Sequence, residues 1–196
     1  FTWTDEPEPH AARRRAILEK YPQVSQLYGP CPRTKVVCTA LVAIQIAAAW
    51  GLRDAPWWLI IGVAYVFGGV VNQALLLAIH ELSHNLAFKK PLHNRLFSLC
   101  VNLPIGVPVA ATFRYYHLLH HTRQGDEQMD TDLPTEFEAR WVRGRWLKLL
   151  WVLCQGFAYG LRPLFVFPKK PDAWEVSNLV LQLAFNALVF YFFGLK

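Results

Sequence analysis

Two long apolar runs joined by four residues limit the fold of this chain more than any other feature. Trp57–Ile79 contains 23 residues without a charge, and Val36–Leu52 contains 17. A helix needs roughly 20 apolar residues to cross the hydrocarbon core of a bilayer, which is about 30 Å thick. Because the connection Arg53–Pro56 is so short, the sequence predicts a transmembrane helical hairpin.

The composition agrees with a membrane protein. Apolar residues make up 54% of the chain and charged residues 17%, whereas soluble domains average about 25% charged residues. The net charge of +6 comes from Lys and Arg next to the apolar runs, which is typical of cytoplasmic segments. No nucleic-acid recognition module is visible, and we expect no nucleic-acid partner.

Three further stretches complete the predicted fold, an all-α integral membrane protein. Trp174–Leu195 is long and apolar enough for another transmembrane helix. Leu96–Thr112 is interrupted by the polar, proline-containing stretch Asn102–Pro108, which favours a re-entrant or interfacial segment. Trp146–Pro168 is apolar but contains three polar or charged residues, and we interpret it as interfacial.

The Lys and Arg residues also predict an orientation. They flank the hairpin on both sides, so both flanks are expected in the cytoplasm, with the Arg53 loop on the far side. His10–Pro22 is predicted to form a basic amphipathic helix, either a solvated cap or a membrane-surface helix. We expect two parts, a cytosolic N-terminal segment (1–35) and an incomplete membrane domain (36–196).

Five of the seven histidines fall in two tight clusters. His80 and His84 stand four residues apart at the end of the second run, and His117, His120 and His121 follow at offsets of three and four. On a helix these spacings place the rings of each cluster on one face. Imidazole suits iron, copper, nickel and zinc, so the two clusters predict a metal centre on cytosolic helices.

The first cluster also matches the H-E-x-x-H motif of zinc proteases. In that alternative His80 and His84 bind zinc and Glu81 is the general base. A catalytic zinc needs three protein ligands, so the second cluster would be largely unused. If both clusters share one centre they must lie on one side of the membrane, which requires Leu96–Thr112 to return to the side that it left.

Beyond these patterns, the chain resembles the membrane fatty-acyl desaturase and hydroxylase superfamily. The resemblance rests on H-x3-H after a hairpin and on H-x2-HH further along. Within that superfamily the chain resembles the sphingolipid delta-4 desaturases, also called dihydroceramide desaturases. The stretches that match most specifically are His10–Pro22, Ala78–Phe88, Asn102–Pro108, Tyr116–His121, Asp130–Thr135 and Arg162–Phe165.

The resemblance implies the chemistry and the partners. It implies two irons bound by histidines, with His80, His84, His117, His120 and His121 as ligands, and no further catalytic residue. It implies oxygen-dependent conversion of dihydroceramide to ceramide, with electrons from NAD(P)H through a reductase and a b-type cytochrome. The expected location is the endoplasmic reticulum membrane, as a multi-pass protein whose histidines face the cytosol.

Some questions stay open at this point. No histidine follows His121, so the family's third box is absent, and we expect the front portion of a longer enzyme that is inactive alone. The alternatives are a sphingolipid C4-hydroxylase, the zinc membrane protease and an inactive truncated product. Glu81 and Asn85 either orient ligand rings or complete a helix end. Asp130 and Asp132 either bind a head group, brace the site or form a solvated turn.

Overall fold

The computed structural model describes residues 9–194, and every regular element in this range is helical. The chain forms two compact units. Unit 2 contains Gly29–Tyr115 together with the chain from Pro171 onward. Unit 1 contains the chain up to Tyr28 together with Tyr116–Lys170.

The predicted hairpin is confirmed in unit 2. Its first helix is α2 (Pro32–Leu52), and its second runs unbroken over 27 residues, Trp57–Ser83. The second helix consists of α3 (Trp57–Val63), a π-helical turn (Ala64–Gly68) and α4 (Gly69–Ser83). Because it continues beyond the apolar run, His80 lies in its last turn.

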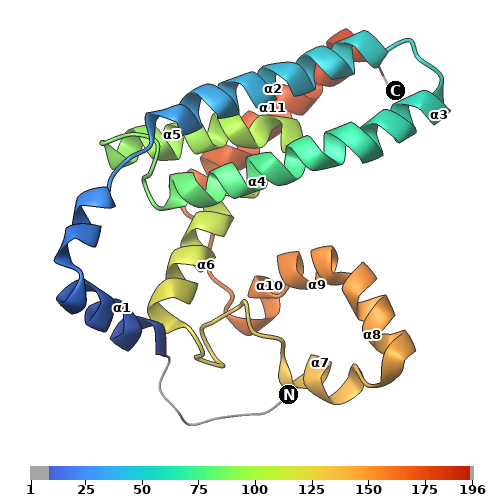
Figure 1. Cartoon of the computed structure of the whole chain (residues 1–196). Helices are drawn as coiled ribbons and strands as arrows, with labels where there is room; N and C mark the ends of the chain where they lie inside the picture. Colours follow the sequence, from blue (N-terminus) through green and yellow to red (C-terminus); the bar gives the residue numbers. More distant parts are fainter. Residues whose placement is uncertain (1–8, 195–196) are drawn as a thin grey trace. The chain divides into compact units, whose positions relative to one another are not determined.

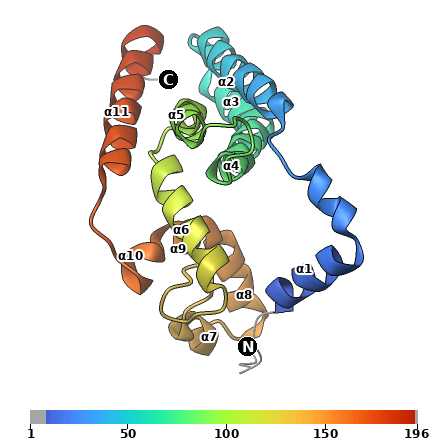
Figure 2. The same cartoon turned by 90° about the vertical axis from the view of Figure 1, so that its left-hand side faces the viewer.

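A third candidate span and a bent pair of helices complete unit 2. The span is α11 (Ala173–Phe193), as the sequence predicts. Helix α5 (Pro91–Asn102) continues into a short 3-10 turn. The next helix, α6 (Ala110–Arg123), is bent by 118° from their common direction. Figure 2 shows α5 between α11 on one side and α2 and α4 on the other. The predicted all-α membrane fold with a turned-back segment is therefore confirmed.

The bend depends on one glycine and one buried asparagine. Gly106 has φ +85°, in the left-handed region that costs residues with a Cβ atom energy. Asn102, which is fully buried, donates to the carbonyl of Val107 at 2.7 Å and accepts from the backbone N–H of Ala110 at 2.8 Å. The Asn102 side chain thus replaces the backbone hydrogen bonds that the turn interrupts.

A polar stripe on α11 satisfies the rest of this segment. Asn178, Gln182 and Asn186 recur every four residues, so they share one face of the helix. Gln182 accepts from Asn102 at 2.6 Å, and Asn186 donates to the carbonyl of Gly106 at 3.0 Å. Irregular backbone at membrane depth is stable only when protein satisfies its polar groups, and α11 does so here.

Unit 1 is made of short helices. Its N-terminal helix α1 (Pro9–Lys20) confirms the predicted helix before Pro22. The predicted division of the chain at residue 35 stays a prediction. After α6 come four helices, which are α7 (Glu136–Trp141), α8 (Gly144–Leu153), α9 (Gln155–Leu161) and α10 (Pro163–Val166).

The breaks between these helices explain why the stretch is not one straight span. The axis of α8 is bent by 66° from the helices that follow it. Figure 1 shows α7 to α10 following one another around a curve. The interfacial position that the sequence predicts for Trp146–Pro168 stays a prediction.

Candidate metal centre

The first histidine pair lies at the C-terminal end of α4. His80 is in the last turn and His84 is the residue that caps the helix, and their ring centroids are 5.1 Å apart. Asn85 follows with φ +61°, a conformation that ends the helix. The structure thus brings together the two rings that the sequence predicts to be neighbours.

Apolar packing and one cation hold this helix end. Leu75, Ile79 and Leu82 are almost completely buried on α4. Arg114 of α6 donates from Nη1 to the carbonyl of Leu82 at 3.3 Å and also to that of Ser83. The last carbonyls of a helix lack partners within the helix and carry partial negative charge, so a guanidinium there stabilises the end.

Glu81 is engaged in a contact between helices. Thr34 of α2 donates from its hydroxyl to Oε2 of Glu81 at 2.9 Å. A metalloprotease base has to sit beside the water of a zinc bound by the two histidines. The contact that Glu81 makes with Thr34 gives the protease alternative no support.

The second histidine group occupies the last turns of α6. The ring centroids of His117 and His121 are 4.6 Å apart, and those of His120 and His121 are 5.5 Å apart. Nε2 of His117 lies 3.1 Å from Nε2 of His121. The three rings that the sequence predicts on one helix face therefore lie together in unit 1.

Asp130 fixes the ring of His120. Nδ1 of His120 lies 2.9 Å from Oδ1 of Asp130, whose side chain is completely buried. The same carboxylate accepts from the backbone N–H groups of Gly125 and Asp132, both at 3.0 Å. An ionised carboxylate only accepts hydrogen bonds, so this contact places the ring proton on Nδ1 and leaves Nε2 of His120 for a metal.

The contacts of Asp130 show whether the acidic turn is better suited to bind a cation or to brace His120. His120, Asp130 and Asp132 have ligand atoms within 4.8 Å of one another, which by distance alone would suit a cation. The oxygens of Asp130, however, are already taken by N–H donors. Bracing of the histidine, one of the roles that the sequence suggested, fits these contacts best.

A buried ion pair between Arg162 and Glu138 supports the turn, and the sequence alone predicts no role for it. Arg162 is only 3% exposed and donates to both carboxylate oxygens of Glu138, at 2.8 and 3.2 Å. It also donates to the carbonyl of Thr131 at 3.3 Å. The sequence signal for this pair is that Arg162 stands alone inside an apolar stretch. An arginine in such a place usually has a buried partner.

The pKa of Glu138 reflects this pairing. Burial by itself raises the pKa of this carboxyl. Hydrogen bonds from Arg162, the backbone N–H of Thr135 and the indole of Trp151 outweigh that effect and lower the pKa to about 2. Glu138 is therefore a permanent anion at neutral pH, and it fixes the position of the Arg162 guanidinium.

The two remaining histidines lie outside both groups. His10 is exposed on α1, and His93 of α5 stands edge-on to the ring of Phe88 at 5.9 Å. Neither was assigned a role from the sequence.

Comparison with known proteins identifies the family. The model of a family described as fatty acid desaturase matches residues 56–196, which include both histidine groups. The chain belongs to the fatty acid desaturase family. A second model, described as sphingolipid Delta4-desaturase, matches residues 1–33 of the chain.

The curated relatives agree with the narrower resemblance as well. The chain is 51% identical to a sphingolipid delta(4)-desaturase of Drosophila melanogaster and 50% identical to a delta(4)-desaturase-like protein of rice, over all of its length. It is 41% identical to a rat sphingolipid delta(4)-desaturase/C4-monooxygenase. The resemblance to the sphingolipid delta-4 desaturases is thus confirmed.

Coverage of these relatives is partial. The chain spans 62% of the Drosophila protein, 60% of the rice protein and 61% of the rat protein. No solved structure is significantly similar to it.

Proposed function

We propose that this desaturase contributes five iron ligands to an enzyme that converts dihydroceramide to ceramide. The observation that supports the proposal most is the 51% identity, over the whole chain, to a protein named sphingolipid delta(4)-desaturase. In the proposed reaction two hydrogens leave adjacent carbons of the sphinganine chain. Dioxygen takes up these two hydrogens with two electrons and two protons from a donor, and leaves as two waters.

The donor set of unit 1 fits iron. Two nitrogens at about 2.1 Å from one metal and roughly at right angles are about 3 Å apart. His117 and His121 have this separation, with 3.1 Å between their Nε2 atoms. Abstraction of an aliphatic hydrogen requires redox chemistry with dioxygen, which a pair of irons supplies. Zinc has no redox chemistry.

We further propose that His80 and His84 share a centre with His117, His120 and His121. The fatty acid desaturase model supports this, because it matches residues 56–196 and these include both histidine groups. Neither group alone has enough imidazoles to hold two irons.

The residues of this chain then have distinct roles. The histidines bind the metals, Asp130 keeps the proton of His120 on Nδ1, and Arg114 positions the end of α4. The apolar spans exclude water and receive the lipid chain. The electron donor is proposed to be a b-type cytochrome with an NAD(P)H-dependent reductase, at the endoplasmic reticulum membrane, with the histidines facing the cytosol.

Product analysis tests the proposal. The complete protein, with any residues that precede or follow this chain, is expressed in membranes that lack sphingolipid desaturation. These membranes are supplied with dihydroceramide, NADH and dioxygen, and the lipids are measured by mass spectrometry. Ceramide, two mass units lighter than the substrate, is expected from the wild type and is absent from His84→Ala and His121→Ala. The absence of any oxygen-dependent product from a folded wild type would contradict the proposal.

The same assay decides about a second candidate, C4-hydroxylation. The name of the rat relative includes C4-monooxygenase, which favours this reaction as an alternative outcome. Both reactions begin by removing a hydrogen from the chain. A product heavier than dihydroceramide by one oxygen atom would show hydroxylation instead of desaturation.

A further inference from the structure

Helix α8 of unit 1 exposes an apolar face. Trp146, Leu150 and Leu153 are 75%, 57% and 73% exposed. At 100° per residue their side chains lie within about 60° of one another around the helix axis. Exposed apolar patches that are contiguous mark interaction sites or membrane contact more often than they mark ordinary surface.

Cations lie outside this apolar face. Arg145 and Lys148 lie on α8, and Arg143 precedes it. All three are exposed, and in residues 9–194 no acidic side chain forms an ion pair with any of them. A helix with aromatic and leucine side chains on one face and Lys or Arg on the other is typical of a segment that lies in a membrane interface.

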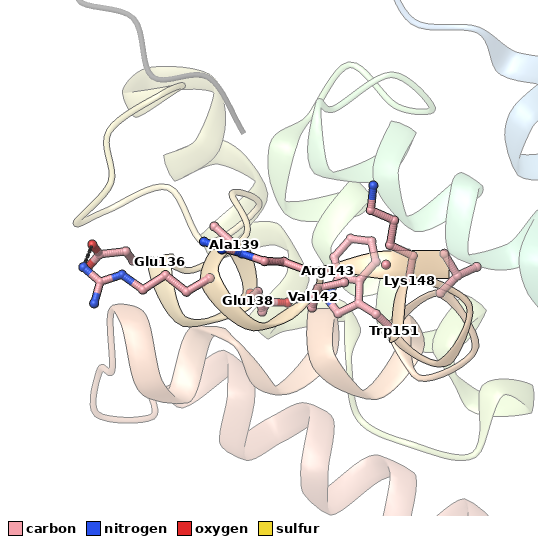
Figure 3. Close-up of a pocket in the computed structure, with 10 residues that line it drawn as sticks. Glu136, Glu138, Ala139, Val142, Arg143, Lys148 and Trp151 are labelled. Carbon is pink, nitrogen blue, oxygen red and sulfur yellow. Dashed lines mark hydrogen bonds and ion pairs between the residues drawn. The ribbon is translucent and has the colours of Figure 1, made fainter. Parts of the chain in front are cut away.

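A hollow of about 770 Å³ opens on this polar side between α7 and α8. Its lining includes Arg143, Lys148 and Trp151, as Figure 3 shows. The acidic residues of the lining already have partners, because Glu136 pairs with Arg140 and Glu138 pairs with Arg162. The hollow is therefore open to a negatively charged group.

The chain of unit 1 leads directly into a candidate membrane span. Six residues connect the end of α10 at Val166 to the start of the candidate span α11 at Ala173. At 3.3–3.6 Å per residue this connection reaches roughly 25 Å at most. An exposed apolar face with cations, in a unit whose chain leads directly into a candidate membrane span, is better matched by lipid than by another protein.

We propose that α7 and α8 form a docking surface for anionic phospholipid. The apolar face of α8 lies among the upper acyl chains, and Arg143, Arg145 and Lys148 lie level with the lipid phosphates. The hollow beside Arg143 and Lys148 receives one headgroup. This contact is independent of the irons and of the reaction, so it is measured without turnover.

Lipid selectivity tests the docking surface. The complete protein is placed in phosphatidylcholine nanodiscs containing traces of spin-labelled phosphatidylserine or phosphatidylcholine, and the immobilised fraction of each label is compared. The test variant is Arg143→Gln/Arg145→Gln/Lys148→Gln. The matched control, Arg13→Gln/Arg14→Gln/Arg15→Gln, removes the same charge from α1. Circular dichroism verifies that both variants are folded.

Each surface cation is worth about a fivefold preference for anionic lipid. The wild type and the control are therefore expected to immobilise phosphatidylserine preferentially, and the test variant is expected to lose most of that preference. Equal preference in the test variant and the wild type would overturn the proposal. Loss of the preference on addition of glycerol 3-phosphate would show a site for a free phosphate, and would overturn it too.

The depth of α8 is measured separately. Brominated acyl chains quench tryptophan fluorescence at short range, so part of the quenching in the wild type is expected to disappear in Trp146→Phe. The control is Trp151→Phe, since Trp151 is half-buried against Glu138. Equal quenching of the wild type and Trp146→Phe would place the apolar face of α8 outside the bilayer and contradict the proposal.

Discussion

The two histidine groups are held by opposite kinds of interaction. The pair on α4 rests on buried leucine and isoleucine side chains, with Arg114 on the carbonyls at the helix end. In the group on α6, His120 is held by Asp130, and the turn of Asp130 is held by Arg162 and Glu138. Packing positions the first group, and a chain of hydrogen bonds and charges positions the second.

This difference has consequences for how each group fails. Apolar packing loses stability in proportion to the volume removed and responds little to pH. A buried ionic network fails when one partner is removed, because the other partner stays buried without its counter-ion. The comparison is tested by variants of each kind, in order of expected effect.

Removal of the Arg162 side chain is expected to have the largest effect. Arg162→Met leaves Glu138 without its partner, and breaking one side of a buried pair costs about 3–5 kcal/mol. The loss is measured as faster hydrogen exchange in α7, α9 and α10 of the detergent-solubilised protein. The double variant Arg162→Met/Glu138→Leu removes both charges and is expected to recover most of the protection. If it does not, the network is not what holds this unit.

A cavity in α4 is expected to cost about 2–5 kcal/mol. Leu82 is 1% exposed, so Leu82→Ala is expected to lower the thermal midpoint of the solubilised protein. Leu77 is 57% exposed on the same helix, and Leu77→Ala is the matched control with little change. Similar losses in both variants would show that packing does not position the first pair.

Substitution of Asp130 separates bracing from folding. Asp130→Asn keeps the size of the side chain but removes its charge and leaves one acceptor oxygen for the three N–H donors of His120, Gly125 and Asp132. Loss of such a partner weakens metal binding about 10–100-fold. Iron retained by the complete protein during titration with a chelator measures the effect, and Asp126→Asn in the same loop is the control. Unchanged retention in Asp130→Asn would remove Asp130 from the site.

Acid is expected to act on the network at lower pH than on ordinary carboxylates. The pKa of Glu138 is about 2 in the folded state and 4.5 as the ordinary value, so folding stabilises its charged form. This contribution is complete above about 4.5 and is lost as the pH falls toward 2. Hydrogen exchange of α7, corrected for intrinsic rates, follows the loss. Glu138→Gln is expected to abolish this pH dependence, and persistence of the dependence in that variant would assign it to another group.

The sequence predicted the membrane helices well because their signal is local. The apolar runs of α2, of Trp57–Ser83 and of α11 are long enough to be recognised alone. Pro and Gly around Gly106 marked the bend, and the spacing of the histidines marked both groups. Each of these features is contained in one continuous stretch of the sequence.

Contacts between distant segments were not predictable in the same way. Glu138 and Arg162 are 24 residues apart, and the Asn102–Gln182 contact spans 80 residues. A single sequence does not show which polar residues of two helices meet. The sequence predicted neither the stripe of Asn178, Gln182 and Asn186 nor its contacts with the Asn102–Pro108 turn.

Metal analysis of the complete protein tests the central claim most directly. Two irons per protein are expected in the wild type, with clear loss in both His84→Ala and His121→Ala. The control His93→Ala is expected to retain both, because His93 lies against Phe88 outside the two groups. One zinc that is lost in His84→Ala but kept in His121→Ala would contradict a shared iron centre.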